Sequence, residues 1–383
     1  MNERSTTLLL ALASHPISSL LSPFLQQTLT TMLSYNFDIA DARIQCSIGS
    51  SFHGTTVALL HFAKGLAFDG ANRLFVADSY NHRVQVFSPD TAQLLESFAT
   101  TSGTSKSSII VYPQCLAIDD DRQRLLVSNT YAHGVQALSL VDHTLVVSDT
   151  TPSGAPVLDF KYPYGVAIDR HLDRVIVADA SNHRLRILAA ADLSLLFDIG
   201  HHGPRPLEFK SPFGVAIDKQ LRRVIVADSF NNRIQVLSAI DMTFLFEFGE
   251  YGSESGRFRE PRAVCVDNAS RIIVADTKNN RLQAFTSRGE FYARFDCGAA
   301  PQGVAFDECR GLIAFSVGHR VHVIAGHQWI PHTLLCWQPD LHRFAPHSVK
   351  QVVEIMTMIR SLVFESPVSL LPNELLFEIF SFL

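Results

Sequence analysis

Residues 226–237 read VADSFNNRIQVL, and near copies of this stretch stand at 76–87, 177–188 and 274–285. Each copy places Asp-x-x-Asn-x-Arg inside a run of strand-forming residues. Successive copies lie about 50 residues apart once a divergent copy at 127–138 is included, and a degenerate sixth unit occupies 303–324. Self-similarity at a fixed period of this size indicates a repeat architecture.

The unit around the quoted stretch divides into four short strand-like segments. PFGVAID, RRVIVAD, NRIQVLS and MTFLFEFG occupy 212–218, 222–228, 232–238 and 242–249, and polar turns separate them. β-branched and aromatic residues in runs of this length favour strands. Four strands in about 50 residues are typical of one blade of a β-propeller.

The two ends of the array are expected to meet in one blade. The sixth unit offers three strands, at 303–307, 311–316 and 319–324. The segment DARIQCSIGS at 41–50 matches the fourth-strand position of the other units. We therefore expect this N-terminal strand to complete the last blade, because pairing it there removes an open sheet edge.

The pattern resembles the NHL-repeat family of six-bladed propellers over about residues 40–326. The resemblance rests on P-x-G-V-A-x-D followed by V-A-D-x-x-N-x-R, and the second unit departs from it at Asn129, Ala132 and Gly134. It implies an all-β, six-bladed NHL-type propeller closed by an N-terminal strand, with short N- and C-terminal α-helical segments. The predicted parts are a helical segment at 1–36, the propeller at 37–326, a connector at 327–347 and a C-terminal helical segment at 348–383.

The repeated polar triad has two possible meanings, a structural clamp or a repeated ligand site. Asp falls at the end of a second strand, Asn in the turn and Arg at the start of the third strand. Asp and Asn cap turns, and Arg can hydrogen-bond a carboxylate. We interpret the triad as a hairpin clamp, because one small ligand cannot use hairpins spread around a ring.

Binding is expected instead at positions that differ between units on the face where these hairpins emerge. One set follows the proline, or Ala63, that opens each first strand: Lys64, Gln114, Tyr164, Phe213, Arg262 and Gln302. A second set lies two residues past the reference Asp or Asn: Tyr80, Tyr131, Ser181, Phe230 and Lys278. Tyr and Arg are common in binding hot spots, and the resemblance implies protein or RNA binding on this face.

The C-terminal stretch LLPNELLFEIFSFL resembles the opening helix of an F-box, the module that docks substrate receptors onto the adaptor of cullin-RING ubiquitin ligases. We expect an amphipathic helix at 348–364 before it. An F-box continues for about two more helices, which this sequence does not supply. The alternative to F-box-like docking is a terminal helix that packs on the neighbouring helix or on the propeller. The predicted docking residues are Leu371, Pro372, Leu375, Leu376, Ile379, Phe380 and Leu383.

Composition limits the remaining function classes. The net charge of −5 argues against nucleic-acid binding driven by bulk charge. The six cysteines show no metal-ligand spacing, which favours free thiols in a reducing compartment. Pro23, Gln26 and Gln27 interrupt the best apolar run, so no membrane span is expected. A cytoplasmic location follows as a prediction.

These observations predict a non-enzymatic, protein-binding propeller without cofactor or metal, with substrate recognition in a cullin-RING ubiquitin ligase as a specific hypothesis. The alternatives are a plain interaction scaffold, an RNA-binding propeller and a metal-dependent propeller lyase or lactonase. The last alternative needs carboxylates, Asn or His that converge on the channel. The post-proline set contains none of these, and His201 and His202 have no second cluster to pair with.

Overall fold

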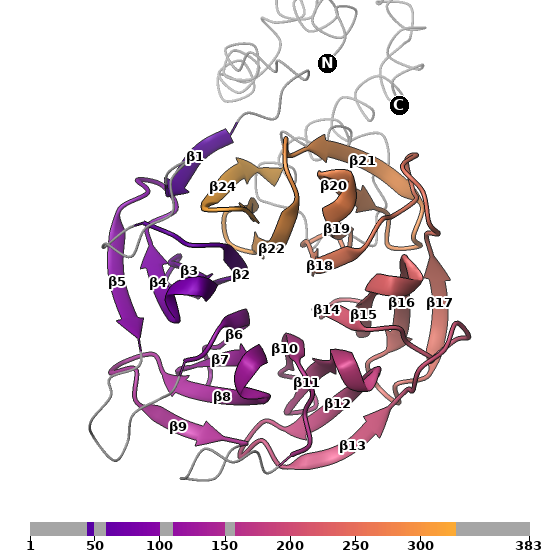
Figure 1. Cartoon of the computed structure of the whole chain (residues 1–383), viewed down its shortest axis with the longest axis horizontal. Helices are drawn as coiled ribbons and strands as arrows, with labels where there is room; N and C mark the ends of the chain where they lie inside the picture. Colours follow the sequence, from indigo (N-terminus) through magenta and orange to yellow (C-terminus); the bar gives the residue numbers. More distant parts are fainter. Residues whose placement is uncertain (1–43, 50–58, 100–109, 150–157, 327–383) are drawn as a thin grey trace, which may run out of the picture. The chain divides into compact units, whose positions relative to one another are not determined.

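The computed structural model describes residues 44–49, 59–99, 110–149 and 158–326, which form six four-stranded antiparallel sheets arranged as blades around an axis (Figure 1). The six-bladed all-β propeller is therefore confirmed. In each blade the first strand lies nearest the axis and the fourth strand lies at the outside.

Blades 1 to 5 follow the order of the sequence. Blade 1 consists of β2 (Ala63–Phe68), β3 (Leu74–Asp78), β4 (Arg83–Phe87) and β5 (Leu94–Ala99). Blade 2 consists of β6 (Pro113–Asp119), β7 (Arg124–Asn129), β8 (Gly134–Ser139) and β9 (Leu145–Ser148). Blade 3 consists of β10 (Pro163–Asp169), β11 (Arg174–Asp179), β12 (Arg184–Ala189) and β13 (Leu195–Ile199). Blade 4 consists of β14 (Pro212–Asp218), β15 (Arg223–Asp228), β16 (Arg233–Ser238) and β17 (Phe244–Phe248). Blade 5 consists of β18 (Pro261–Val266), β19 (Ile272–Asp276), β20 (Arg281–Phe285) and β21 (Phe291–Asp296).

Blade 6 closes the ring with strands from both ends of the array. It consists of β22 (Pro301–Asp307), β23 (Leu312–Val317), β24 (Arg320–Ala325) and β1 (Ile44–Gly49). β1 pairs antiparallel with β24, and Ile48 lies opposite Val321. The predicted closure by an N-terminal strand is confirmed, and it leaves β24 without an open edge.

Burial differs between the inner and outer strands because each blade is packed between two others. Every residue of β11 and β15 is buried, and both strands have the sequence RVIVAD, in which four apolar residues lie between the opening Arg and the final Asp. In β5 and β17 burial alternates along the strand, as expected for a strand with one face in solvent. Apolar clusters fill the spaces between adjacent blades, such as the one that joins Ile176 and Leu185 to Val224.

The glycine of each P-x-G motif lets neighbouring first strands approach closely. A Cβ added at Gly214 would lie 2.7 Å from the carbonyl oxygen of Arg262, and one at Gly165 would lie 2.4 Å from that of Phe213. A side chain at these positions would force the inner strands apart. The residue before the glycine is thereby fixed at the axis, which is where the predicted post-proline set lies.

The Asp-Asn-Arg triads form the predicted hairpin clamps. In blade 4, Asp228 Oδ2 accepts hydrogen bonds from Asn231 Nδ2 at 2.9 Å and from Arg233 Nε at 2.9 Å, and its Oδ1 accepts the Lys210 N–H at 2.7 Å. The Arg233 guanidinium also donates to backbone carbonyls of the connection between blades, including Pro204 at 2.6 Å. The same Asp–Arg contact is present in blades 1, 3 and 5, at Asp78–Arg83, Asp179–Arg184 and Asp276–Arg281.

A second series of Asp–Arg pairs, which the sequence reasoning missed, lies at the opposite ends of the first strands. It is present in all six blades as Asp69–Arg73, Asp119–Arg124, Asp169–Arg174, Asp218–Arg223, Asp267–Arg271 and Asp307–Arg310. Several of these arginines reach the next blade: Arg223 Nη1 donates to the carbonyl of Ser287 at 2.6 Å. The signal in the sequence is an Asp followed by Arg three to five residues later in every unit.

Several expectations lie outside the described residues. These are the helical segment at 1–36, the connector at 327–347, the helix at 348–364 and the F-box-like docking residues at 371–383. Within the described part, five cysteines are free thiols: Cys46, Cys115, Cys265, Cys297 and Cys309. The same part contains no helix that is long and apolar enough to cross a membrane.

Candidate active site

The six post-proline residues form one ring at the axis, which we call the axial ring. Each is the second residue of an innermost strand, on β2, β6, β10, β14, β18 and β22. Contacts join members from adjacent blades around much of the ring. The axial ring consists of Lys64, Gln114, Tyr164, Phe213, Arg262 and Gln302.

Two cations of the axial ring share one region. Lys64 Nζ donates to Gln114 Oε1 at 2.9 Å, and Arg262 Nη1 donates to Gln302 Oε1 at 2.8 Å. Burial and, as the smaller cause, the positive charge of Arg262 together lower the pKa of Lys64 to about 8. The charge of Arg262 acts on Lys64 although the two residues come from blades 5 and 1. Lys64 therefore carries an amine that can release its proton near neutral pH.

The other half of the axial ring is aromatic. The rings of Tyr164 and Phe213 stack with their centroids 4.2 Å apart and their planes 13° from parallel. The Arg262 guanidinium lies 5.4 Å from the centre of the Phe213 ring, within the range of a cation–π interaction. Burial raises the pKa of Tyr164, which keeps its hydroxyl protonated as a hydrogen-bond donor. The ring thus combines a flat apolar surface with two cations.

The second predicted set lies on short 3-10 turns around the axial ring. Tyr80 is in η2 (Ser79–Asn81), Tyr131 in η3 (Thr130–Ala132), Phe230 in η5 (Ser229–Asn231) and Lys278 in η6 (Thr277–Asn279). Tyr80, Tyr131 and Phe230 are exposed, at 44%, 57% and 42%. Phe230 lies 5.7 Å from Phe213 between ring centroids, which connects the turn in blade 4 to the axial ring. Ser181 occupies the same position in η4 (Ala180–Asn182).

Three aromatic residues that the sequence reasoning missed complete an arc across blades 1 to 3. Phe62, Tyr112 and Tyr162 directly precede the first strand of their blades and have left-handed backbones, with φ of 52°, 46° and 53°. Ring centroids follow one another at 4.8 Å (Phe62–Tyr80), 5.3 Å (Tyr80–Tyr112), 4.5 Å (Tyr112–Tyr131) and 5.7 Å (Tyr131–Tyr162). Their position immediately before the strand-opening proline or Ala63 is the signal that could have found them.

Histidines of the turns hold this arc in place. The Tyr112 N–H donates to His82 Nδ1 at 3.2 Å, and the Tyr162 N–H donates to His133 Nδ1 at 3.1 Å. Both histidines follow their 3-10 turns in the left-handed conformation. The contacts run from one blade to the next, so they fix the position of the aromatic arc relative to the axial ring.

The described residues do not fit a divalent cation at the axis. No three His, Cys, Asp or Glu side chains of the described residues gather where they could hold a metal ion. Glu260, beside the axial ring, is paired with Arg262 at 3.4 Å and with Lys278 at 3.9 Å. Hard cations need several oxygen ligands, and this ring offers amide oxygens next to two positive charges instead.

Carboxylates do lie at the opposite end of the inner strands, where they are paired with cations. Arg170 Nη2 donates to Asp120 Oδ2 at 2.7 Å, and Lys219 pairs with Glu308. Cations of neighbouring blades therefore compensate these two carboxylates. The axial ring is the end of the propeller where positive charge lies beside exposed aromatic side chains.

Comparison with known proteins agrees with this fold. The NHL repeat, as a family of sequences, matches residues 60–87, 160–188 and 258–285, which lie in blades 1, 3 and 5. No curated protein sequence matches the chain. The protein is a six-bladed β-propeller that contains NHL repeats. The fold is compatible with protein binding.

Among solved structures, the chain is similar to a gluconolactonase from Xanthomonas campestris. The two share 12% sequence identity with a TM-score of 0.54, over 74% of this chain and 98% of the other. At this identity the likeness establishes the fold. Because that propeller is an enzyme, the finding contradicts our prediction of a non-enzymatic binding protein and of a ligase subunit, and it favours the lactonase alternative. The prediction rested on the absence of carboxylates, Asn and His from the post-proline set, and it did not consider the effect of Arg262 on the pKa of Lys64.

Proposed function

We propose that the protein is a hydrolase that opens a lactone at the axial ring, with Lys64 as general base and Arg262 as the donor that stabilises the oxyanion. One observation carries the proposal: the partly buried Lys64 amine, at a pKa of about 8, lies within the field of Arg262. Enzymes that use lysine in proton transfer commonly tune its pKa to about 7–8 by burial and neighbouring charge. The gluconolactonase likeness supports the choice of reaction.

The proposed chemistry needs only groups of this chain and water. Neutral Lys64 Nζ accepts a proton from a water molecule while the water oxygen attacks the lactone carbonyl carbon. Negative charge develops on the carbonyl oxygen, and the Arg262 guanidinium donates hydrogen bonds to it. The ring C–O bond then breaks, and the leaving oxygen takes the proton back from Lys64. Lactone and water give one hydroxy acid, and Lys64 returns to its neutral state.

The surrounding residues have positioning roles in this proposal. Gln114 accepts a hydrogen bond from Lys64 Nζ at 2.9 Å and fixes the direction of the amine. Gln302 does the same for Arg262 at 2.8 Å. Tyr164 and Phe213 offer a flat surface on which the substrate ring can pack. Since the described residues do not fit a divalent cation, no step involves a metal ion.

The test is lactone hydrolysis by the purified protein, with glucono-δ-lactone and other sugar lactones as substrates. Removing the base in Lys64→Met should lower kcat by a factor of about 10²–10⁴, which is the usual contribution of a general base. Lys64→Arg keeps the charge without a usable base at pH 8, so it should lose as much. Lys161→Met removes an exposed lysine outside the axial ring and should leave the rate unchanged.

Two results would overturn the proposal: a wild-type protein that hydrolyses no lactone, or a Lys64→Met variant as active as wild type. Treatment with EDTA should not change the rate, and loss of activity with EDTA would show that the mechanism is wrong. The predicted protein and RNA partners stay predictions that this proposal does not need. The cytoplasmic location also stays a prediction.

A further inference from the structure

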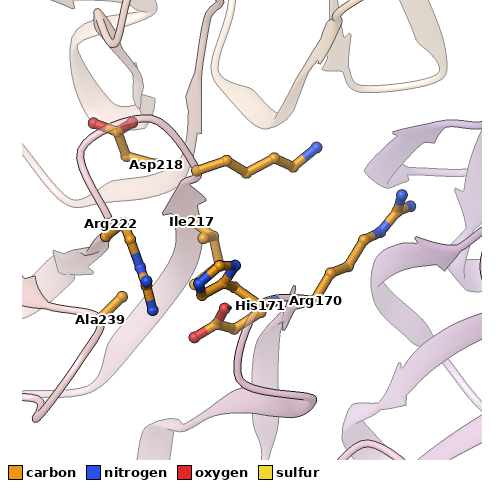
Figure 2. A pocket seen from close by; sticks show the side chains of 8 residues that line it. Arg170, His171, Ile217, Asp218, Arg222 and Ala239 are labelled. Carbon is orange, nitrogen blue, oxygen red and sulfur yellow. Dashed lines mark hydrogen bonds between the residues drawn. The ribbon is translucent and has the colours of Figure 1, made fainter.

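A separate pocket lies between blades 3 and 4, at the end of the strands opposite the axial ring. Its volume is about 250 Å³. Two hairpins form most of it, the one between β10 and β11 and the one between β14 and β15, and Ala239 contributes from the end of β16 (Figure 2). The side chains that decide its chemistry are Arg170, His171, Lys219 and Arg222.

The two carboxylates of this pocket are fully used within the hairpins. Asp169 Oδ2 accepts from Arg174 Nε at 3.0 Å, and its Oδ1 accepts the His171 N–H at 3.2 Å. Asp218 Oδ2 accepts from Arg223 Nη2 at 2.7 Å, and its Oδ1 accepts from Ser270 Oγ at 2.9 Å. These carboxylates are neutralised by arginines that do not line the pocket. The charge that remains at the pocket is positive.

Arg222 is the cation that this arrangement leaves without a partner. Within the described residues its guanidinium makes no ion pair or hydrogen bond, while its backbone is fixed by the Ala239 N–H, which donates to the Arg222 carbonyl at 2.8 Å. Figure 2 shows Arg222 and His171, from blades 4 and 3, directed toward the same space. An unpaired guanidinium can donate two parallel hydrogen bonds to an anion such as phosphate.

The junction between blades 2 and 3 gives an internal comparison. There Asp173, at the position of Arg222, pairs with Arg122 of the preceding blade at 2.6 Å. At the junction of blades 3 and 4, Leu172 stands at the position of Arg122, so this position offers Arg222 no partner of opposite charge. The equivalent position therefore takes part in an ion pair, Arg122–Asp173, at the junction of blades 2 and 3. At the junction of blades 3 and 4 it holds Arg222, which has no such ion pair within the described part of the chain.

We propose that this pocket binds the phosphate group of a small phosphorylated molecule. Arg222 would take two phosphate oxygens with its planar guanidinium, and the His171 imidazole would donate to a third. Arg170 and Lys219 add positive charge at the edge, although each is already paired, with Asp120 and Glu308. The volume leaves room beside the phosphate for a small organic group. This site is independent of the proposed hydrolysis at the axial ring.

The test is calorimetric titration of the full chain with inorganic phosphate at low ionic strength, with glycerol 3-phosphate as the organic monoester. Wild type should show saturable binding at one site. Arg222→Gln removes the guanidinium and should weaken phosphate binding by a factor of about ten or more. The variant should fold, because Gln123 occupies the same left-handed position in blade 2. Arg288→Gln, an exposed arginine on the hairpin after β20, should bind like wild type. Lys64→Met should also bind like wild type, which separates this site from the axial ring.

A second variant tests the pocket without removing a cation. Leu172→Glu places a carboxylate opposite Arg222 and should abolish phosphate binding by filling the role that Asp173 has for Arg122. Thermal unfolding of each variant shows whether it has folded. Absence of saturable binding in wild type would overturn the proposal, and so would unchanged binding in folded Arg222→Gln. Equal affinity for acetate would overturn the phosphate assignment.

Discussion

Ser211 donates its backbone N–H to Nδ1 of His183 at 3.0 Å, and this hydrogen bond joins blade 4 to blade 3 two residues before Phe213 of the axial ring. His183 follows the 3-10 turn of blade 3 with a left-handed backbone at φ 58°. An imidazole accepts at Nδ1 only while that nitrogen carries no proton. The contact between the blades therefore depends on neutral histidine.

Acid should weaken this contact. Burial lowers the pKa of His183 below its ordinary value of 6.5, and the nearby His202 lowers it further. Because the folded-state pKa is the lower one, the stability from neutral His183 is fully present above pH 6.5. It is lost as the pH falls through the folded-state pKa. Urea unfolding of wild type at a series of pH values should show that the free energy of unfolding falls in acid. His183→Ala should lower the free energy of unfolding by about 1–2 kcal/mol at pH 7.5, because it loses the hydrogen bond and places Ala in a left-handed backbone.

The chain itself supplies the control for this prediction. In blade 4, Asn232 occupies the equivalent position, and its Oδ1 accepts the Glu260 N–H at 3.0 Å. His183→Asn should therefore keep the stability near pH 7.5 and remove the loss of stability in acid. If the pH dependence of His183→Asn equals that of wild type, the titrating group lies elsewhere.

The hairpin clamp should respond differently to single and double substitutions. Arg233→Gly leaves the buried Asp228 carboxylate without its cation and should cost about 3–5 kcal/mol. The double variant Asp228→Asn/Arg233→Gly reproduces the pair Asn129 and Gly134, which lie opposite each other in blade 2. It should cost clearly less than the sum of the two single variants, because no uncompensated charge remains. Chemical denaturation of the three variants measures the coupling, and strict additivity would refute the role of the ion pair.

The blades and the axial ring could be predicted from the sequence because both depend on register. Proline and glycine of the P-x-G motif fix the strand start, so the position of Tyr164 follows from that of Pro163. The closeness of Lys64 and Arg262 could not be predicted, because it depends on ring closure between residues about 200 positions apart in sequence. Tyr112 and Tyr162 were missed for another reason. Their left-handed backbones turn them toward Tyr131, and strand patterns carry no information on that conformation.

Asp149 should make the stability fall as the pH rises. It stands just after β9, where the corresponding residue of blade 3 is Ile199, and its Oδ1 accepts the Val135 N–H at 2.7 Å. Burial raises the pKa of Asp149 to about 7, although Arg186 of blade 3 opposes the rise. The folded state then binds the proton more tightly than the unfolded chain does. The contribution of protonated Asp149 to the free energy of unfolding is complete below the ordinary pKa of 3.8, and it is lost as the pH rises to about 7.

The matched variant for this residue is Asp149→Asn, which keeps an oxygen acceptor for the Val135 N–H and cannot ionise. The difference in free energy of unfolding between Asp149→Asn and wild type should grow in favour of the variant between pH 4 and pH 7. It should be constant above that range. A difference that does not change with pH would show that Asp149 does not titrate in this window.

The pH dependence of lactone hydrolysis should follow the protonation of Lys64. At pH 7 roughly a tenth of the Lys64 amine is neutral for a pKa of about 8. The rate should therefore rise nearly tenfold per pH unit below pH 7 and level off above pH 8.

Removing the second cation in Arg262→Met should raise the pKa of Lys64, because the repulsion from the guanidinium disappears. The inflection of the pH–rate profile should move upward in Arg262→Met, in addition to the lower kcat caused by loss of the oxyanion donor. Initial rates measured from pH 6 to pH 10, corrected for spontaneous lactone opening, distinguish the two effects. An inflection that stays in place in Arg262→Met would show that another group is the base.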